Sequence, residues 1–214
     1  MIPKRLFLWS GLLLLSLAGL TLAWLYWPVS QVERVLDFSP QQMLPSAGVE
    51  PLLGPRRMHL TFPAWVRLGD QASIRLTFSP LPGESVTPAQ NPYTIYAETH
   101  LDMPKLNPDP SGVAGQVLPP AQAVTFWWQL HPDRAGLAEG TAWLSLRFEP
   151  LDGGEPLVNA VAAPRLSIPV RGFLGMSVTA VRWLGGLSAL CGLLALFRFI
   201  LPDLTTRAFK KRAR

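Results

Sequence analysis

Apolar and polar residues alternate through the middle of the chain with the period of two that β-strands require. Met58, Leu60 and Phe62, for example, alternate with His59 and Thr61. The pattern predicts strands over residues 58–62, 74–78, 93–101, 123–130, 141–148 and 166–170. Turn residues separate these segments, and no helical pattern intervenes. A mainly β fold follows: an antiparallel β-sandwich or barrel of about seven strands over residues 58–171.

The first segment with no alternation is residues 6–27, which contains no charged residue. As a helix it would be roughly 33 Å long, enough to cross the hydrocarbon core of a bilayer. Aromatic residues close the segment, as expected at a membrane interface. The alternative is a cleaved signal peptide, with Thr21 and Ala23 as the small residues before the cut. Apolar character continues through Trp27, which favours a retained anchor.

A second apolar segment spans residues 172–201 and is interrupted by Arg182 and Arg198. Because an arginine at the bilayer centre costs about 2.5–3.5 kcal/mol, the membrane span should place both near its boundaries. A span over 183–201 does so, after an interfacial or helical lead-in. The residues expected at the membrane boundaries are Lys4, Arg5, Trp24, Trp27, Arg182, Trp183 and Arg198.

The charges are unevenly distributed. Residues 28–172 hold ten basic and thirteen acidic residues, whereas the two ends together hold nine basic residues and one acidic residue. By the positive-inside rule, residues 1–5 and the basic tail 202–214 lie in the cytoplasm. Residues 28–172 then lie outside the cytoplasmic (inner) membrane. Because the excess of basic residues belongs to these flanks, the charge does not indicate a nucleic-acid partner.

Small residues form a stripe on each apolar segment. Gly185, Ser188, Ala189 and Gly192 share one face of the second segment, and Ser16, Gly19 and Ala23 form a shorter stripe on the first. Small residues let helices approach closely within lipid. We expect the two helices to pack on each other through these stripes. The alternative is that one stripe contacts a helix of another protein.

Residues 28–57 differ from both neighbouring parts because prolines are frequent and no strand alternation occurs. Val32, Val35 and Leu36 have the spacing of one short helical turn. We therefore expect a proline-rich extracytoplasmic stalk that links the first membrane helix to the sandwich.

Two stretches of the sandwich carry a resemblance to a known family. The run from Trp128 through Pro132 to Gly136, followed by the alternating strand 144–148, resembles the late strands of bacterial immunoglobulin-like domains on membrane proteins. The opening residues 60–63, with 68–70 before the next strand, are similar to the first two strands of those domains. The resemblance covers about residues 58–171. It implies an adhesion, assembly or sensory module without catalysis, and it assigns no role to any residue.

No catalytic motif is recognisable. His59, His100 and His131 are far apart in sequence, and the only cysteine, Cys191, lies in the second apolar segment. This excludes the histidine–cysteine copper site that some sandwiches carry. The chain also lacks a nucleophile elbow, a phosphate-binding loop and a zinc-protease motif. We therefore expect no enzymatic activity, no cofactor and no metal.

Two tryptophans lie at positions that alternation assigns to the solvent side. If Phe126 and Trp128 face the core, Trp127 faces outward. If Leu144 and Leu146 face the core, Trp143 also faces outward. Large exposed rings indicate contact with a partner, the membrane interface or another part of the chain. We expect Trp127 or Trp143 to be an interaction site unless loops of the same chain cover both rings.

These features predict a non-catalytic accessory or assembly protein of a prokaryotic cytoplasmic membrane. It would be anchored in the lipid bilayer and bind another membrane or envelope protein through its sandwich, its stalk or its helix faces. The alternative is an extracytoplasmic ligand- or carbohydrate-binding sensor, which would need a pocket or groove lined by aromatic residues such as Trp127 or Trp143.

Overall fold

The computed structural model describes residues 4–44, 53–81 and 92–212, with side chains described between Leu8 and Arg198. The chain forms two compact units. One unit consists of residues 29–171 and holds all the strands of the described chain. The other combines residues 1–28 with residues 172–214 and holds the two long helices.

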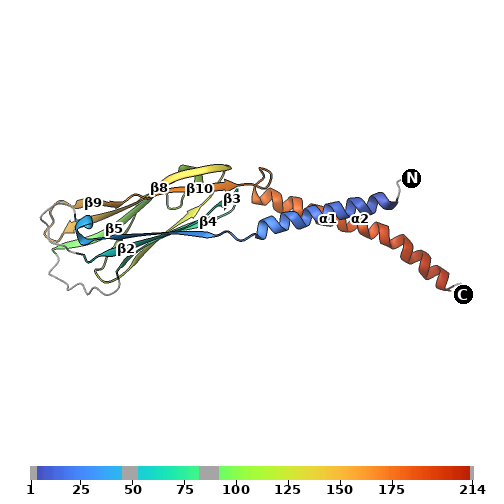
Figure 1. Ribbon diagram of the computed structural model, residues 1–214, viewed down its shortest axis with the longest axis horizontal. Helices are drawn as coiled ribbons and strands as arrows, with labels where there is room; N and C mark the ends of the chain where they lie inside the picture. Colours follow the sequence, from blue (N-terminus) through green and yellow to red (C-terminus); the bar gives the residue numbers. More distant parts are fainter. Residues whose placement is uncertain (1–3, 45–52, 82–91, 213–214) are drawn as a thin grey trace. The chain divides into compact units, whose positions relative to one another are not determined.

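The strand unit is built from two sheets (Figure 1). The four-stranded sheet has the order β1 (Gln31–Phe38), β2 (Arg56–Pro63), β4 (Ala72–Pro80) and β7 (Val124–Leu130). The six-stranded sheet has the order β3 (Val66–Arg67), β10 (Arg165–Arg171), β8 (Gly136–Pro150), β5 (Tyr93–Asp102) and β6 (Ala114–Val117), with β9 (Leu157–Ala162) also paired to β8. Every pair is antiparallel except β3 with β10, which is parallel.

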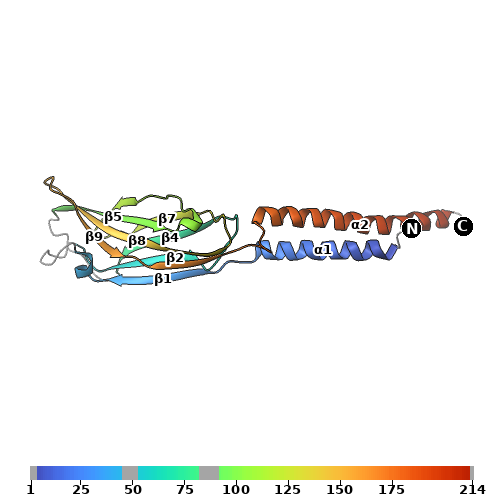
Figure 2. The same ribbon diagram turned by 90° about the horizontal axis from the view of Figure 1, so that it is seen from above.

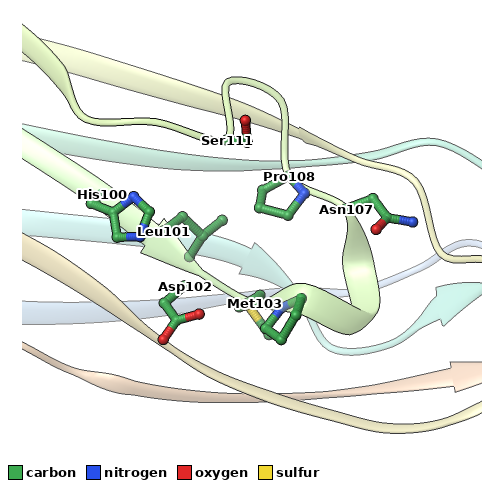
Figure 3. Close-up of a pocket in the computed structure, with 8 residues that line it drawn as sticks. His100, Leu101, Asp102, Met103, Asn107, Pro108 and Ser111 are labelled. Carbon is green, nitrogen blue, oxygen red and sulfur yellow. The ribbon is translucent and has the colours of Figure 1, made fainter.

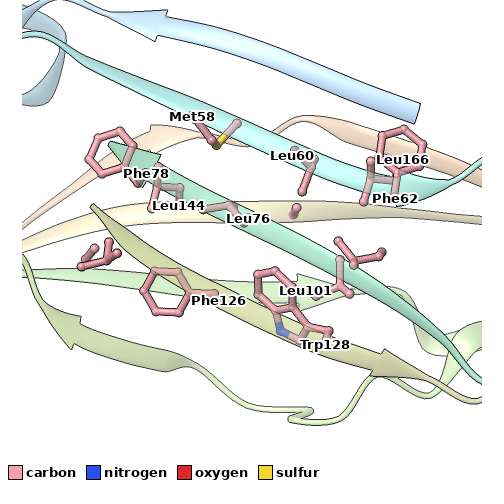
Figure 4. Close-up of a cluster of buried hydrophobic side chains, with 14 of the residues drawn as sticks. Met58, Leu60, Phe62, Leu76, Phe78, Leu101, Phe126, Trp128, Leu144 and Leu166 are labelled. Carbon is pink, nitrogen blue, oxygen red and sulfur yellow. The ribbon is translucent and has the colours of Figure 1, made fainter. Parts of the chain in front are cut away.

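The apolar residues that alternate along the strands fill the space between the two sheets (Figure 4). Leu60 and Leu76 from one sheet and Leu144 and Leu146 from the other are almost fully buried, as is Trp128. Alternation produces this arrangement because successive side chains of a strand point to opposite faces. The expected mainly β sandwich with an apolar helix at each end is confirmed, and the six strands predicted from alternation are all present.

The expected stalk is wrong over β1. Residues 31–38 form an edge strand that pairs along its whole length with β2, from Gln31 opposite Pro63 to Phe38 opposite Arg56. Val32, Val35 and Leu36 have the spacing of a helical turn, but these residues form a strand. In it, Val32 and Leu36 share one face with Arg34, and Val35 lies on the other face. After β1, the 3₁₀ turn η1 (Pro40–Met43) inserts Met43 into the core.

The described chain has ten strands rather than about seven. The additional ones are β1 and three short strands, β3, β6 and β9. None of the short strands has a strong alternating pattern: β6 carries one apolar side chain larger than alanine, Val117, and β9 is apolar at nearly every position. Pairing with longer neighbours stabilises them, which outweighs local propensity.

Arg56 is the most deeply buried charged side chain described. It is fully buried at the start of β2, and its guanidinium lies over the Phe78 ring at 5.4 Å. Burial lowers the pKa of Arg56 to about 10, so the side chain stays charged at neutral pH. Its two terminal nitrogens donate hydrogen bonds to the carbonyls of Pro119, Pro120 and Gln122 at 2.7, 2.8 and 3.0 Å. Arg56 therefore fixes the segment that connects β6 in one sheet to β7 in the other.

The second unit is an antiparallel pair of helices, α1 (Lys4–Tyr26) and α2 (Val178–Arg212), which run side by side (Figure 2). Glycines set their separation. A Cβ at Gly192 would lie 3.1 Å from the carbonyl oxygen of Gly11, and a Cβ at Gly185 would lie 2.6 Å from the Thr21 hydroxyl. Gly185, Ser188 and Gly192 are buried in this contact, and Ala189 is half-buried.

The stripe expected on the first helix is wrong as part of this contact. Ser16, Gly19 and Ala23 are exposed, and a Cβ at Gly19 would meet nothing within 4 Å. The buried small residues of α1 are instead Gly11, Ala18 and Thr21. Both sets have helical spacing, so the sequence of α1 alone did not distinguish the face that meets α2.

Residues 173–177 form a turn, in which the Met176 N–H donates to the carbonyl of Phe173 at 3.0 Å. Helix α2 begins at Val178, so the lead-in expected before the span at 183 is helical over residues 178–182. It then continues past Pro202 to Arg212, which makes most of the expected basic tail helical.

We expect Arg56→Met to lower the free energy of unfolding of the sandwich by about 2–3 kcal/mol, because three partly buried carbonyls lose their donors. Chemical denaturation in detergent, followed by tryptophan fluorescence, measures the change. Arg57→Met is the matched control. Arg57 is half-buried and pairs at the surface with exposed Asp37 at 2.6 Å, and such surface pairs contribute about 1 kcal/mol or less. Equal losses for both variants would contradict the role given to Arg56.

We expect Gly185→Leu to separate the two helices, because the added side chain overlaps Thr21, and to cost about 1–3 kcal/mol of stability. Gly186→Leu is the control at the neighbouring position, where a Cβ would meet nothing within 4 Å. Thermal unfolding of both variants in the same detergent provides the comparison. If Gly186→Leu is as damaging as Gly185→Leu, the assigned packing face is wrong.

Candidate functional site

The outward side of the six-stranded sheet carries aromatic and charged side chains around Trp143, and we call it the Trp143 face. Its centre lies on β5 and β8, whose inward residues, such as Ile95 and Leu144, fill the core. The alternate positions face outward. Pairing of the two strands places Tyr96 opposite Arg147, Glu98 opposite Ser145, His100 opposite Trp143 and Asp102 opposite Thr141.

Trp143 lies in the middle of this face with 46% of its surface exposed. Directly opposite residues of antiparallel strands have Cβ atoms about 4.5–5.5 Å apart, so Trp143 and His100 are immediate neighbours. Exposed rings of this size are uncommon, because tryptophan is highly buried on average. The described part of the chain leaves the Trp143 ring accessible.

A charged pair lies one row away from Trp143. Arg147 Nε is 2.9 Å from Glu98 Oε1, close enough for an ion pair, although the Nε–H is not aligned for a hydrogen bond. The Arg147 guanidinium also lies 4.8 Å from the centre of the Tyr96 ring. Pairing of β6, β5, β8 and β9 extends this row to exposed Val117 and Val158. Tyr96, Val117 and Val158 therefore place apolar groups near the charged pair.

On the β5 side, this face is bordered by a hollow of about 360 Å³, which we call the His100 hollow (Figure 3). Its polar groups come from His100 and Asp102 on β5 and from Asn107 and Ser111 on the following loop. His100 Nδ1 is buried and has no hydrogen-bond partner among the described residues. The hollow is therefore lined by an imidazole ring, a carboxylate, an amide and a hydroxyl.

The loop that shapes the His100 hollow is held firmly. It begins with the 3₁₀ turn η2 (Pro104–Leu106), whose Leu106 is fully buried in the core. The carbonyl of Leu106 accepts from the His131 N–H at 2.6 Å, and Asp109 and Gln129 exchange two backbone hydrogen bonds of 2.8 Å. These contacts tie the loop to β7, so the hollow is formed before any ligand arrives.

On the β10 side lies a second hollow of about 540 Å³, which we call the Arg165 hollow. Outward residues of β8 and β10 form its floor, in the register Thr141 opposite Arg165 and Glu139 opposite Ser167. Arg34 lines it from the other sheet and donates a hydrogen bond from Nη1 to the carbonyl of Arg165 at 2.7 Å. Asp102, Thr141 and Arg165 lie in one cross-strand row, so the two hollows are on either side of β8 near Trp143.

Gly140 in β8 allows the end of β5 to pack closely against it. A Cβ at this position would overlap the carbonyl oxygen of Asp102 and the side chain of Met103. A residue with a side chain would push the end of β5 away from β8. Gly140 therefore keeps Asp102 in the same row as Thr141.

These groups can form hydrogen bonds, ion pairs and aromatic contacts. Among the described residues there is no group of three or more histidine, cysteine, aspartate or glutamate side chains that could hold a metal ion. Ser111, His100 and Asp102 all line one hollow, but no hydrogen bond joins them as a catalytic triad would require. The arrangement is suited to recognition of a ligand or partner.

The other predicted tryptophan is in a different environment. Trp127 is 55% exposed on the outward side of β7, in the four-stranded sheet, and the Arg75 guanidinium lies 5.1 Å from the centre of its ring. Arg75 is also its cross-strand partner, and the next row pairs Thr125 with Thr77, whose hydroxyls are 3.2 Å apart. None of the residues that line the two hollows lies beside Trp127 on this sheet.

The predicted membrane-boundary residues lie at several places on the helix unit. Trp24 packs against Phe173 with ring centres 5.6 Å apart, and Trp27 follows the last residue of α1 with 65% exposure. Trp183 is 70% exposed in the second turn of α2. Arg182 and Arg198 are exposed, whereas the side chains of Lys4 and Arg5 fall outside the described side chains.

Sequence reasoning identified Trp143 but missed its neighbours. Alternation had marked residues 93–101 and 141–148 as strands without assigning a role to Asp102 or Thr141. It did not supply the register that brings these strands together. Arg34 was assigned to a stalk, so its contact with Arg165, 131 residues away, had no local signal.

No protein-family model and no curated protein matches the chain. Several solved structures are weakly similar. The cupredoxin domain of amoB from Nitrosocaldus yellowstonii has 19% identity and a TM-score of 0.26, and the match covers 48% of this chain and 57% of that domain. The chain therefore spans little more than half of that domain's length.

Two further matches have comparable scores. The PapD-like domain 7 of human CEP192 has 12% identity and a TM-score of 0.26, with 52% of this chain and 78% of that domain covered. AggA, the major subunit of aggregative adherence fimbriae type I from Escherichia coli, has 8% identity and a TM-score of 0.30, with 66% and 96% covered. At these values the matches assign neither a function nor a site to this chain.

Proposed function

We propose that this chain is a non-catalytic accessory protein, anchored in the cytoplasmic membrane, that binds another envelope protein through its Trp143 face. The observation that carries the proposal is the exposed Trp143 ring, whose neighbours His100 and Thr141 line the two hollows and which shares its face with the Glu98–Arg147 pair. Protein interfaces favour tryptophan, tyrosine and arginine at their centres, and this face offers all three.

The membrane anchor is supported by the helix pair. Leu8–Tyr26 and Val178–Arg198 are long and apolar enough to cross a bilayer. Large apolar side chains such as Leu187, Leu190, Leu194 and Phe197 are exposed on α2, as expected where a helix contacts lipid. The two helices are antiparallel to each other, so the start of α1 and the end of α2 lie at the same end of the pair (Figure 2). Basic residues near both termini favour a cytoplasmic location for that end.

A fold related to immunoglobulin-like domains fits this role. The two sheets pack face to face over one apolar core, and no disulfide is available within residues 29–171 because the only cysteine is Cys191. Such sandwiches commonly present a sheet face or loop cluster to partners. The fold alone does not select a partner, so the proposal relies on the Trp143 face.

The second candidate function is a ligand- or carbohydrate-binding sensor. It is favoured by the two hollows beside Trp143, with volumes of about 360 and 540 Å³ in the range of small-molecule sites. The two functions can be distinguished by what remains bound to the Trp143 face. A sensor binds a small soluble ligand in the absence of any protein, whereas an accessory protein remains with its partner during purification.

We expect the wild-type chain, purified from its native membrane in mild detergent, to retain a partner protein that Trp143→Ala loses. A central tryptophan contributes about 2 kcal/mol or more, which corresponds to roughly thirtyfold weaker retention. Quantitative mass spectrometry of the purified samples measures the amount of partner protein retained. Trp127→Ala is the matched control, because it removes a ring of similar exposure from the other sheet. A wild-type chain that elutes alone, or equal losses in both variants, would count against the proposal.

We expect residues 28–172 to be accessible from outside the cell. In a Cys191→Ser background, a membrane-impermeant thiol reagent should label Ser73→Cys in intact cells, because Ser73 is exposed on the sandwich. The same reagent should label Lys211→Cys only after the cells are permeabilised. The reverse pattern would show that the sandwich is cytoplasmic.

A further inference from the structure

Two arginines, Arg34 and Arg165, line the Arg165 hollow, and the Arg34 guanidinium is hydrogen-bonded to the backbone of Arg165. Arg34 crosses from the four-stranded sheet, where its guanidinium lies 5.7 Å from the centre of the Phe62 ring. Its Nη1 atom donates to the carbonyl of Arg165 at 2.7 Å, which fixes the side chain at the edge of β10. The Arg165 side chain lies on the outward side of the same strand and lines the same hollow.

Neither arginine forms an ion pair within 4.0 Å with any carboxylate of the described residues. One carboxylate, that of Glu139, lines the hollow, and it too has no ion pair in the described part of the chain. The hollow therefore carries two positive charges and one negative charge. The hydroxyls of Thr141 and Ser167 complete its polar lining.

This set of groups matches the chemistry of an oxyanion. A guanidinium presents its N–H groups as a planar fork that fits two oxygens of a carboxylate or phosphate, and a hydroxyl can donate to a further oxygen. Hydrogen bonds from arginine to such groups are shorter and stronger than neutral ones. Because Arg34 is already anchored by Arg165 and Phe62, little side-chain freedom is lost when it binds.

The neighbouring ring extends the recognition beyond the charge. Trp143 follows Thr141 by two positions on the same face of β8, a distance of about 6.5 Å along the strand. A flat apolar group attached to the oxyanion can therefore reach the exposed indole. The volume of about 540 Å³ is also larger than a lone carboxylate needs.

We propose that the Arg165 hollow binds an oxyanion, either carboxylate or phosphate, that is attached to a flat ring placed against Trp143. This site does not depend on the proposed protein partner: it would bind a small anion whether or not an envelope protein is retained. Loss of one property would therefore leave the other measurable.

The test uses the full chain in non-ionic detergent with two fluorinated probes, 4-fluorobenzoate for the carboxylate and 4-fluorophenyl phosphate for the phosphate. Ligand-observed ¹⁹F NMR detects weak binding, and acetate or inorganic phosphate serves as the competitor that lacks a ring. We expect at least one probe to bind and to be displaced by its competitor. Binding of one probe alone identifies the group. Failure of both to bind overturns the proposal.

Variants then locate the site. Arg165→Gln and Arg34→Gln should each weaken binding about tenfold to a hundredfold, as expected when a hydrogen bond to a charged group is lost. Glu139→Gln should tighten binding, because it removes the negative charge from the hollow. Trp143→Ala should weaken binding of the fluorinated probes and leave the ringless competitors unchanged.

Arg134→Gln is the control for general electrostatic attraction, because Arg134 is exposed in the turn before β8 and does not line the hollow. If it weakens binding as much as Arg165→Gln, the Arg165 hollow is not the site. Ser167→Ala tests the site even if the Arg34 variant does not fold, because it removes one hydroxyl from the lining and leaves the Arg34–Arg165 contact in place. Unchanged affinity in Arg165→Gln, Arg34→Gln and Ser167→Ala together would overturn the assignment.

Discussion

The unbroken alternation along β8 is the constraint on which both the core and the Trp143 face depend. This strand pairs with β5 on one side and with β10 and β9 on the other, so it lies inside the six-stranded sheet. Ala142, Leu144 and Leu146 complete the core from its inward side. Because the side-chain period of a strand is two, the same register forces Trp143 and Thr141 outward. A slip of one residue would bury polar groups and expose the core.

The proposed recognition relies on this rigid placement. Strand pairing and the closely packed Gly140 fix the backbone near Trp143, so the His100 and Arg165 hollows are formed by the chain itself. Preorganised groups lose little conformational entropy on association, which favours binding by a small number of well-placed side chains. In the proposed interface, the exposed Trp143 ring would supply apolar contact and the polar side chains around it would orient the partner. Such a division between an apolar centre and polar surroundings is the usual anatomy of a protein interface.

Much of the sandwich could be predicted because alternation is a local property, and the strands around Leu60, Leu76 and Leu144 followed from it directly. Edge strand β1 could not, since Arg34 occupies an inward position and breaks the apolar pattern that would have marked a strand. Its guanidinium is accommodated there by Phe62 and by the carbonyl of Arg165, which are contacts distant in sequence. The packing face of α1 could not be predicted for the same reason. The choice between its two sets of small residues depends on where α2 lies, and α2 is distant in sequence. In the site, Trp143 was recognisable from its strand alone, whereas the hollows beside it required the register of three strands.

The most direct test of the central claim is site-specific photo-cross-linking in intact cells, with a benzophenone amino acid placed at position 158 or at position 73. Val158 is exposed on the Trp143 face opposite Arg147, so the probe leaves Trp143 in place, whereas Ser73 is exposed on the other sheet. The account predicts a discrete adduct to one envelope protein from position 158 and none from position 73. Absence of an adduct at position 158, or the same adduct from both positions, would contradict the assignment of the Trp143 face as the binding surface.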